Sequence, residues 1–336
     1  MNILFRCDGS LEIGMGHVVR CVALAKYLKD YYEVNIYFAM KKSELGISYV
    51  KSSFDVLVKR NSQSDYLRWL EYCIESTNAS TLILDVRDGL LRGQLKLLKQ
   101  RFKLKIVTID DNEDKRLESD VAFYPPVPQI RNMDWKEFGG ELYVGWEYVL
   151  LRDNLKKHVQ NIEKSYENIT LLVMMGGSDK NDNTGQIVNL LSKLNIFHKV
   201  LIILGPGYRF HSKLKRRLFS VNYTYEVFFN PNDVFHQMKK ADLGIILFGQ
   251  VAYELAALNI PAMYICQTID HLESSSLFLN EGIGVPLGLE PVEENLFYCQ
   301  LKELVNDTNL LKRMHCSLKM IKLSDLGAIS KIILNN

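Results

Sequence analysis

A glycine-containing turn near the start of the chain joins an apolar run to an amphipathic segment. The run Ile-Leu-Phe at residues 3–5 predicts a strand. Apolar residues then recur with helical spacing at Val18, Cys21, Val22, Leu24, Ala25 and Leu28. Gly14 and Gly16 lie between the two segments, where the backbone can take a positive φ or approach a ligand closely. Because open α/β sheets bind ligands at the carboxyl ends of their strands, this turn predicts a binding site.

His17 follows this turn directly. The first N–H groups of a helix attract anions, and their partial positive charge favours the neutral imidazole, which accepts a proton. Asp8 and Glu12 of the same loop are placed to orient or to oppose that ring. The alternative interpretation is structural, a tight turn whose histidine caps the helix.

Strand-like and helix-like segments alternate along the rest of the chain. Apolar runs predict strands at residues 34–38, 54–58, 81–84, 105–109, 169–174, 199–204, 223–225, 243–247 and 261–265. The part after Leu272 is predicted to be helical, and its last helix spans about residues 325–334. A proline-rich segment at 125–128 and a charged segment after residue 152 divide the chain. The pattern predicts an α/β protein with one domain over residues 1–150 and a second over residues 165–336.

Polar and glycine-rich turns follow several of these strands. Asp85 and Asp88 follow one strand of the first half, and Asp110, Asp111 and Asn112 follow another, although Asp111 and Asn112 read equally well as helix caps. In the second half the corresponding turns contain Gly176, Gly177 and Ser178, then Gly249 and Gln250, then Asp270 and His271. Glycine turns before helices suit phosphate oxygens. Two such domains facing each other across a cleft would suit a diphosphate with two sugar ends. A dinucleotide would fit as well, although G-x-G-x-x-G is absent from the sequence.

The composition excludes several other functions. The net charge of +2 and the dispersed basic residues give no reason to expect nucleic acid or an anionic membrane as a partner. The six cysteines form no C-x-x-C pair and the seven histidines have no metal-ligand spacing, so we expect reduced thiols, no metal and no cofactor. Uncharged apolar stretches are too short to span a bilayer, and a soluble, cytoplasmic protein is predicted. The oligomeric state stays open.

A series of short motifs resembles a known family. The first combines Arg6-x-Asp8 with Ile13-Gly14-x-Gly16-His17-x-x-Arg20-Cys21-x-x-Leu24-Ala25. The others are Ile109-Asp110-Asp111, Gly145-x-x-Tyr148-x-x-Leu151-Arg152, Gly176-Gly177-Ser178-Asp179, and Ala241-Asp242-Leu243 leading to Glu254-Leu255-Ala256-Ala257-Leu258. Together, and in this order, they resemble the nucleotide-sugar hydrolases of pseudaminic acid biosynthesis and the related spore-coat polysaccharide proteins.

This resemblance implies a GT-B-like fold of two Rossmann-like domains with a cleft between them, and a specific reaction. UDP would be removed by water from a 2,4-diacetamido-2,4,6-trideoxy hexose, without a metal and with inversion at the anomeric carbon. It also implies that His17 is the general base, with Asp8 orienting the water or the histidine. Arg6 and Arg20 would hold the structure or the substrate.

In the second domain, the resemblance places Gly176, Gly177 and Ser178 near the diphosphate. It places Glu254 on the ribose hydroxyls, against the plainer interpretation of a helix-face acid. His271 would touch the sugar or phosphate, or simply cap its helix.

Two segments depart from the family pattern. The usual Gly-Gly-Ser/Thr before the glutamate helix is here Phe248-Gly249-Gln250, and a common Asn-Gln pair is here Asp270-His271. Both are positions where the nucleotide or the sugar would be held. Two alternatives to hydrolysis therefore stay open. One is a GT-B glycosyltransferase that uses the same base on an acceptor hydroxyl, and the other is a non-catalytic protein that binds nucleotide sugars.

Overall fold

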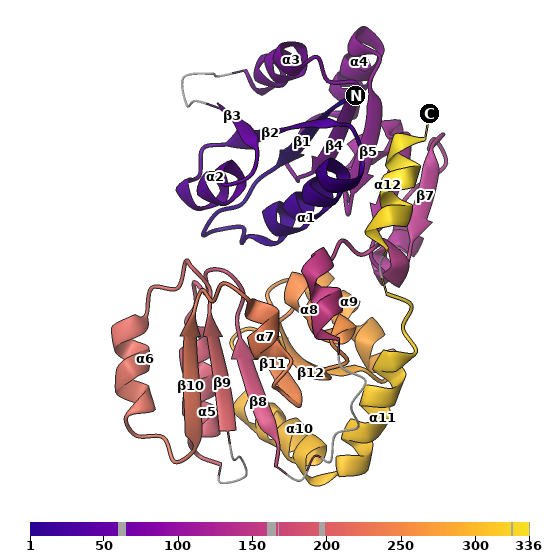
Figure 1. Cartoon of the computed structure of the whole chain (residues 1–336). Coiled ribbons are helices and arrows are strands. Elements are labelled where there is room, and N and C mark those ends of the chain that lie inside the picture. The colour runs from indigo at the N-terminus through magenta and orange to yellow at the C-terminus, as the bar shows by residue number, and fades with distance from the viewer. Residues whose placement is uncertain (60–64, 160–165, 167, 195–198, 324, 336) are drawn as a thin grey trace. The chain divides into compact units, whose positions relative to one another are not determined.

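The computed structural model describes residues 1–59, 65–159, 166, 168–194, 199–323 and 325–335. The chain divides into two compact units (Figure 1). Unit 1 contains Met1–Asp153 together with Lys322–Asn336, and unit 2 contains Asn154–Ile321.

In the described part of unit 1, seven parallel strands form a sheet of order β3-β2-β1-β4-β5-β6-β7. The strands are β1 (Asn2–Cys7), β2 (Asn35–Lys41), β3 (Asp55–Lys59), β4 (Thr81–Asp85), β5 (Lys105–Ile109), β6 (Val121–Tyr124) and β7 (Glu141–Val144). Strands β2 and β3 are added on one side of β1, and strands β4 to β7 are added on the other side. The strand order therefore changes direction between β1 and β4. Ligands of doubly wound sheets bind at the carboxyl ends of the strands at this switch point.

Helices cover both faces of this sheet. Odd-numbered residues of β1, such as Phe5, contribute to a core with α1 (Gly16–Tyr31), whereas Leu4 faces α3 (Tyr66–Thr77) and α4 (Arg92–Phe102). The short helix α2 (Glu44–Lys51) contributes Val50 to the α1 side. Burial on both faces explains why β1 and β4 are almost continuously apolar.

The last helix, α12 (Leu326–Leu334), packs in unit 1, although the sequence placed it with the second domain. Its residues Leu326, Ile329 and Ile333 are buried in the same core as α1. Lys105 of β5 also donates a hydrogen bond to the carbonyl of Ile332 at 3.2 Å. Apolar residues spaced three and four apart give α12 one buried face, and a partner for that face exists on α1.

The described residues of unit 2 form a six-stranded parallel sheet of order β10-β9-β8-β11-β12-β13. Its strands are β8 (Thr170–Met174), β9 (Lys199–Leu204), β10 (Thr224–Phe229), β11 (Leu243–Leu247), β12 (Ala262–Cys266) and β13 (Gly284–Leu289). Its helices are α5 (Asn183–Leu191), α6 (His211–Leu218), α7 (Val234–Met238), α8 (Gln250–Ala257), α9 (Ile269–Asn280), α10 (Glu294–Asn306) and α11 (Thr308–Lys319). Both units thus have the Rossmann-like strand order, and the predicted α/β class is confirmed.

The structure also contains elements that the sequence did not predict. Strand β7 and helix α2 lie in stretches without a clear apolar period, whereas β6 is an apolar run of four residues, Val-Ala-Phe-Tyr, that was not recognised. Strand β13 lies in a part of the chain that was expected to be helical, and this expectation was wrong. Its sequence, Gly-Val-Pro-Leu-Gly-Leu, does not read as a strand, but its pairing with β12 completes the sheet.

Candidate functional site

A histidine–aspartate pair lies at the carboxyl edge of the unit 1 sheet. His17 is the second residue of α1, and Asp85 is the last residue of β4. Asp85 stands beside Cys7 in the pairing of β4 with β1, so the turn after β1 reaches it. The imidazole Nδ1 of His17 lies 2.6 Å from Oδ1 of Asp85. The Asp85 side chain is fully buried, whereas 29% of the His17 side chain is exposed.

Arg20, one turn further along α1, binds the same carboxylate with two nitrogens. Its Nε donates to Asp85 Oδ2 and its Nη2 to Oδ1, both at 2.6 Å, while Nη1 lies 3.3 Å from Oδ2 of Asp110. Burial alone would raise the pKa of Asp85, but the charge of Arg20 and the hydrogen bonds from Arg20 and His17 outweigh it and hold this pKa well below the usual range. Asp85 is therefore an ionised, firmly oriented carboxylate.

These contacts fix the tautomer of His17. An ionised carboxylate only accepts hydrogen bonds, so the 2.6 Å contact with Asp85 Oδ1 favours a proton on Nδ1, and it is shorter than the 3.1 Å contact between the same nitrogen and Arg20 Nη2. The lone pair of the neutral imidazole is then on Nε2, on the side of the ring away from Asp85. A histidine held in this way by a carboxylate can take up a proton from a bound hydroxyl or water.

The glycine turn supports this placement. Gly14 has φ of +78°, and its carbonyl accepts a hydrogen bond from the backbone N–H of Ser10 at 3.1 Å. Gly16 is the first residue of α1, directly before His17. The turn closes on itself and begins the helix beside the end of β1.

Arg6 and Asp8 form a second ion pair, and Asp8 does not contact the histidine. Asp8 accepts a hydrogen bond from Arg6 Nη2 at 2.6 Å and another from the backbone N–H of Lys41 at 2.7 Å. Arg6 is fully buried; its guanidinium carbon lies 5.6 Å from the ring centroid of Tyr66 and 5.5 Å from that of Trp69. Asp85, not Asp8, orients the imidazole ring. The Arg6–Asp8 pair instead ties β1 to the end of β2.

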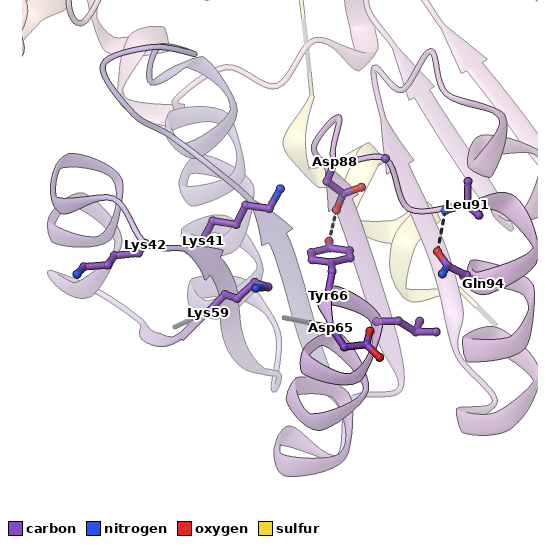
Figure 2. Close-up of a pocket in the computed structure, with 10 residues that line it drawn as sticks. Lys41, Lys42, Lys59, Asp65, Tyr66, Asp88, Leu91 and Gln94 are labelled. Carbon is purple, nitrogen blue, oxygen red and sulfur yellow. Dashed lines mark hydrogen bonds between the residues drawn. The ribbon is translucent and has the colours of Figure 1, made fainter. Parts of the chain in front are cut away.

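A pocket opens on the α3 side of the same sheet edge (Figure 2). Its volume is about 880 Å³. Its lining residues are Lys41, Lys42, Lys59, Asp65, Tyr66, Leu67, Asp88, Gly89, Leu91 and Gln94. They come from the carboxyl ends of β2 and β3, the start of α3, and the segment that leads from β4 into α4. Tyr66 donates a hydrogen bond to Asp88, as the dashed line in Figure 2 shows.

A buried cluster of charges holds Asp88 in place. The side chain of Asp88 is fully buried, with Arg6 Nε 3.6 Å and Lys115 Nζ 3.5 Å from its oxygens. Lys115 also contacts Glu113 and lies 3.3 Å from Oδ2 of Asp111. Burial outweighs the attraction of Lys115 and raises the pKa of Asp111 to about 6.

In unit 2, the turn with Gly176, Gly177 and Ser178 follows β8 and is half-buried. Gly176 has φ of +74°. The carbonyl of Gly177 accepts a hydrogen bond from the N–H of Gly207 at 2.8 Å. A Cβ atom on Gly205 would lie 2.5 Å from the carbonyl oxygens of both Gly176 and Gly177. The turn after β9 therefore packs directly against the turn after β8, with no room for a side chain.

Side chains fasten this glycine turn to its neighbours. Asp179 accepts hydrogen bonds from the backbone N–H groups of Asn183 and Thr184 at 2.8 and 2.9 Å. Glu290, after β13, accepts from the side-chain amides of Asn181 at 2.7 Å, Asn183 at 2.6 Å and Gln267 at 3.2 Å. One carboxylate thus links the turns that follow β8, β12 and β13.

The remaining expected residues lie at the same edge of the unit 2 sheet. Gly249 (φ +157°) and Gln250 start α8, whose residue Glu254 is buried at 2% exposure. Asp270 and His271 are in the first turn of α9, which is capped by Thr268 through a hydrogen bond from the N–H of His271. Because β8, β11 and β12 are parallel neighbours, their glycine and polar turns lie beside one another.

Phe248 fills the position that departs from the family pattern. It is almost fully buried, with its ring centroid 5.3 Å from those of Tyr264 and Phe278 and 5.9 Å from that of His271. The departing residues Phe248 and His271 are thus in contact, across the turns that follow β11 and β12.

Some site residues were not identified from the sequence. Asp85 was noted only as a polar residue after a strand, and Tyr66 and Glu290 were not singled out. The end of a buried strand is the signal that could have pointed to Asp85; Tyr66 and Glu290 have no local signal. Over the described ranges, no group of three or more His, Cys, Asp or Glu side chains could hold a metal ion, and no helix is long and apolar enough to cross a membrane.

Two known proteins are similar to this chain in sequence over most of its length. The chain is 24% identical over 319 residues to the spore coat polysaccharide biosynthesis protein SpsG of Bacillus subtilis, covering 94% of this chain and 92% of that protein. It is 25% identical over 284 residues to the UDP-2,4-diacetamido-2,4,6-trideoxy-β-L-altropyranose hydrolase of Campylobacter jejuni, covering 83% of this chain and 96% of the hydrolase.

Structural similarity extends over the whole chain. The crystal structure of MurG from Acinetobacter baumannii matches with a TM-score of 0.71 at 13% identity, covering 100% of this chain and 99% of MurG. No protein-family model matches the chain. The sequence relatives agree with the motifs of the two glycine turns: the chain is similar in sequence to SpsG and to the Campylobacter hydrolase, and it has the fold of two Rossmann-like domains that is seen in MurG.

Proposed function

We propose that the protein is a nucleotide-sugar hydrolase that removes UDP from a 2,4-diacetamido-2,4,6-trideoxy hexose, as in pseudaminic acid biosynthesis. The contact that carries this proposal is the one between His17 Nδ1 and Asp85 Oδ1. It leaves a partly exposed imidazole with its basic nitrogen directed away from the carboxylate. The similarity to the Campylobacter hydrolase over 83% of the chain supports the choice of reaction and substrate class.

In the proposed mechanism, His17 Nε2 accepts a proton from a water molecule as the water oxygen attacks the anomeric carbon. The bond between that carbon and the diphosphate oxygen breaks, and UDP leaves with the bonding electron pair. The configuration at the anomeric carbon is inverted. A positioned general base contributes about 10²–10⁴-fold to the rate. Asp85 and Arg20 act through His17, because they hold the ring and its tautomer.

UDP binding is assigned to the turns of unit 2. The turn of Gly176, Gly177 and Ser178 and the start of α8 at Gly249 and Gln250 present backbone N–H groups, which suit diphosphate oxygens. Glu254 is proposed to bind the ribose hydroxyls. Asp270 and His271, at the start of α9, are proposed to contact the sugar or the phosphate.

A glycosyltransferase is the second candidate, and the pocket in unit 1 favours it. The pocket lies at the same sheet edge as His17 and has the volume of an ordinary small-molecule site. An acceptor bound there would replace water as the nucleophile, and His17 would take the proton from its hydroxyl group.

The deciding experiment measures UDP release from UDP-2,4-diacetamido-2,4,6-trideoxy-β-L-altrose without acceptor or metal. Wild type is compared with His17→Ala and with His236→Ala, a control at an exposed histidine of α7. We expect turnover by wild type and by the control, and a loss of about 10²–10⁴-fold in His17→Ala with unchanged UDP affinity. In ¹⁸O-labelled water the label should appear on the sugar and not on UDP.

UDP binding without release in wild type would overturn the hydrolase proposal for this sugar. Release that appears only after an acceptor is added would identify a transferase. Binding without turnover under every condition would identify a non-catalytic nucleotide-sugar-binding protein.

A further inference from the structure

Three side-chain amides of unit 2 converge on the carboxylate of Glu290. Its Oε1 accepts from Nδ2 of Asn181 at 2.7 Å and from Nε2 of Gln267 at 3.2 Å, and its Oε2 accepts from Nδ2 of Asn183 at 2.6 Å. Among the residues that the structure describes, no lysine, arginine or histidine forms an ion pair with this carboxylate. Amide groups, and not a cation, therefore surround its negative charge.

The backbone of Glu290 is fixed at the carboxyl edge of the unit 2 sheet. Its N–H donates to the carbonyl of Cys266 at 2.9 Å, and the preceding residue, Leu289, pairs with Cys266 at the end of β12. Gln267 follows Cys266 directly, so one of the three amides belongs to the turn that leads into α9. The carboxylate thus extends from a backbone position that β12 holds.

The other two amides come directly after the glycine turn of residues 176–178. Asn181 lies between β8 and α5, and Asn183 is the first residue of α5 and only 2% exposed. The backbone N–H of Asn183 donates to Asp179 at 2.8 Å, within the same turn. Its side chain instead binds Glu290, 107 residues away in the chain. Glu290 therefore connects this segment to a distant part of unit 2.

The same contact fixes the orientation of the Asn183 amide. An ionised carboxylate only accepts hydrogen bonds, so the NH₂ group of Asn183 faces Glu290 and its Oδ1 faces away. That oxygen is buried and has no hydrogen-bond partner among the described residues. An unpaired buried acceptor costs free energy, and the hydrogen bond to a charged carboxylate offsets this cost. The orientation of Asn183 thus depends on Glu290.

Glu290 has two opposite effects on an anion bound at the neighbouring glycine turn. Its negative charge repels the anion. Its three hydrogen bonds hold the surrounding turns in place before a ligand arrives, and such preorganisation strengthens binding because less conformational freedom is lost. The two effects predict changes of opposite sign in affinity when the charge is removed.

We propose that Glu290 is a positioning residue for UDP binding. Through the three amides it holds the turns that follow β8 and β12 in the arrangement that receives the diphosphate. The inference rests on the proposed function for the location of UDP in unit 2, and it deepens that function by naming the residue that keeps the two turns together. It requires no turnover.

The test measures UDP affinity by calorimetry in wild type and in Glu290→Gln, which keeps the length of the side chain and removes its charge. The new side chain has one acceptor oxygen, and its NH₂ group would face the NH₂ group of Asn183. We expect the affinity to fall about tenfold, although removal of the charge alone would raise it. Urea unfolding measures any loss of stability separately.

The control variant is Glu293→Gln, at another hydrogen-bonded glutamate of unit 2. Glu293 caps α10 by accepting from the backbone N–H groups of Asn295 at 2.9 Å and Leu296 at 2.5 Å. Its replacement removes the same charge and weakens a helix cap. We expect lower stability and the UDP affinity of wild type.

A second comparison tests whether Glu290 acts through Asn183. In an Asn183→Ala background no amide faces the introduced NH₂ group, so Glu290→Gln should weaken UDP binding by no more than about twofold further. Unchanged or tighter UDP binding in Glu290→Gln, an equal loss in Glu293→Gln, or the full loss in the Asn183→Ala background would each overturn the role of Glu290 and leave the hydrolase proposal standing. No UDP binding by wild type would instead overturn the location of UDP in unit 2, and this inference with it.

Discussion

Oδ1 of Asp85 lies 2.6 Å from Nδ1 of His17, although 68 residues separate the two in the chain. The contact depends on the neighbouring positions of β1 and β4, because α1 follows β1 and Asp85 ends β4. Only one ring nitrogen of His17 is then left to act as a base. Nδ1 is committed to the carboxylate, and proton transfer is left to Nε2.

Replacing Asp85 with asparagine should slow the reaction about as much as replacing the histidine. The amide can donate from its NH₂ group to Nδ1, which favours the tautomer with the proton on Nε2, where it blocks the base. In a serine protease triad the same exchange of aspartate for asparagine lowers kcat about 10⁴-fold. We expect a loss of about 10²–10⁴-fold in UDP release, measured under the conditions given for His17→Ala.

A variant that combines His17→Ala with Asp85→Asn shows whether Asp85 acts through His17. If it does, His17→Ala/Asp85→Asn should be no slower than His17→Ala alone, since residues that act as a unit are not additive. Losses that multiply in the double variant would contradict a shared role. Urea unfolding of each variant separates a rate effect from loss of folded protein.

The stability contribution of Asp85 should depend on acid pH. Its pKa in the folded protein is lowered by Arg20 and His17 despite its burial, so below the ordinary aspartate pKa of about 4 the unfolded chain binds the extra proton. The contribution is therefore fully present above that pH and is lost as the pH falls. Asp85→Asn removes the buried carboxylate that binds Arg20 through both of its oxygens, leaving Arg20 the longer contact with Asp110 at 3.3 Å, and should cost about 3–5 kcal/mol at pH 7.

The measurement is urea unfolding at pH 7, 5 and 3.5. The difference in unfolding free energy between wild type and Asp85→Asn should be similar at pH 7 and 5 and smaller at pH 3.5. A difference that grows as the pH falls would contradict the ionised state of Asp85. Asp114→Asn, at a side chain that is 83% exposed, is a control that should change stability little.

Much of the fold could be predicted from the sequence because its strands are short, apolar and buried on both faces. The run that forms β4 is recognisable from its own residues. Strand β13 is not, because glycine and proline interrupt it and its stability comes from pairing with β12. The position of α12 also has no local signal, since a single apolar face can pack on either unit.

The site could be predicted only in part, for a related reason. Glycine turns and His17 are local features, and the structure places them at the carboxyl edges of the two sheets as expected. The partner of His17 is a long-range feature. Asp8 was expected to orient the water or the histidine, but its oxygens accept hydrogen bonds from Arg6 and from the N–H of Lys41. Choosing Asp85 instead requires the strand order, which no single stretch of sequence contains.

Gly205→Ala should disturb the glycine turn of unit 2 without touching any proposed ligand contact. The new Cβ would lie 2.5 Å from the carbonyl oxygens of Gly176 and Gly177, which are backbone atoms and cannot rotate away. Overpacking of this kind costs about 1–3 kcal/mol. Because the shifted backbone belongs to the proposed diphosphate site, we expect UDP to bind about tenfold more weakly, measured by calorimetry. Gly139→Ala, where a Cβ meets open space, should keep wild-type affinity, and equal affinities in the two variants would argue against this turn as the diphosphate site.

The contribution of Asp111 to stability should depend on pH in the opposite sense from that of Asp85. Burial raises its pKa in the folded protein to about 6, so between about pH 4 and 6 the folded state holds a proton that the unfolded chain has released. Relative to Asp111→Asn, wild type should therefore gain stability as the pH falls from 7 to 4, by about 2–3 kcal/mol for a difference of about two pKa units. Urea unfolding at pH 7, 5.5 and 4 measures the gain. A constant difference between the two proteins would show that the attraction of Lys115, 3.3 Å away, balances the burial of this carboxylate.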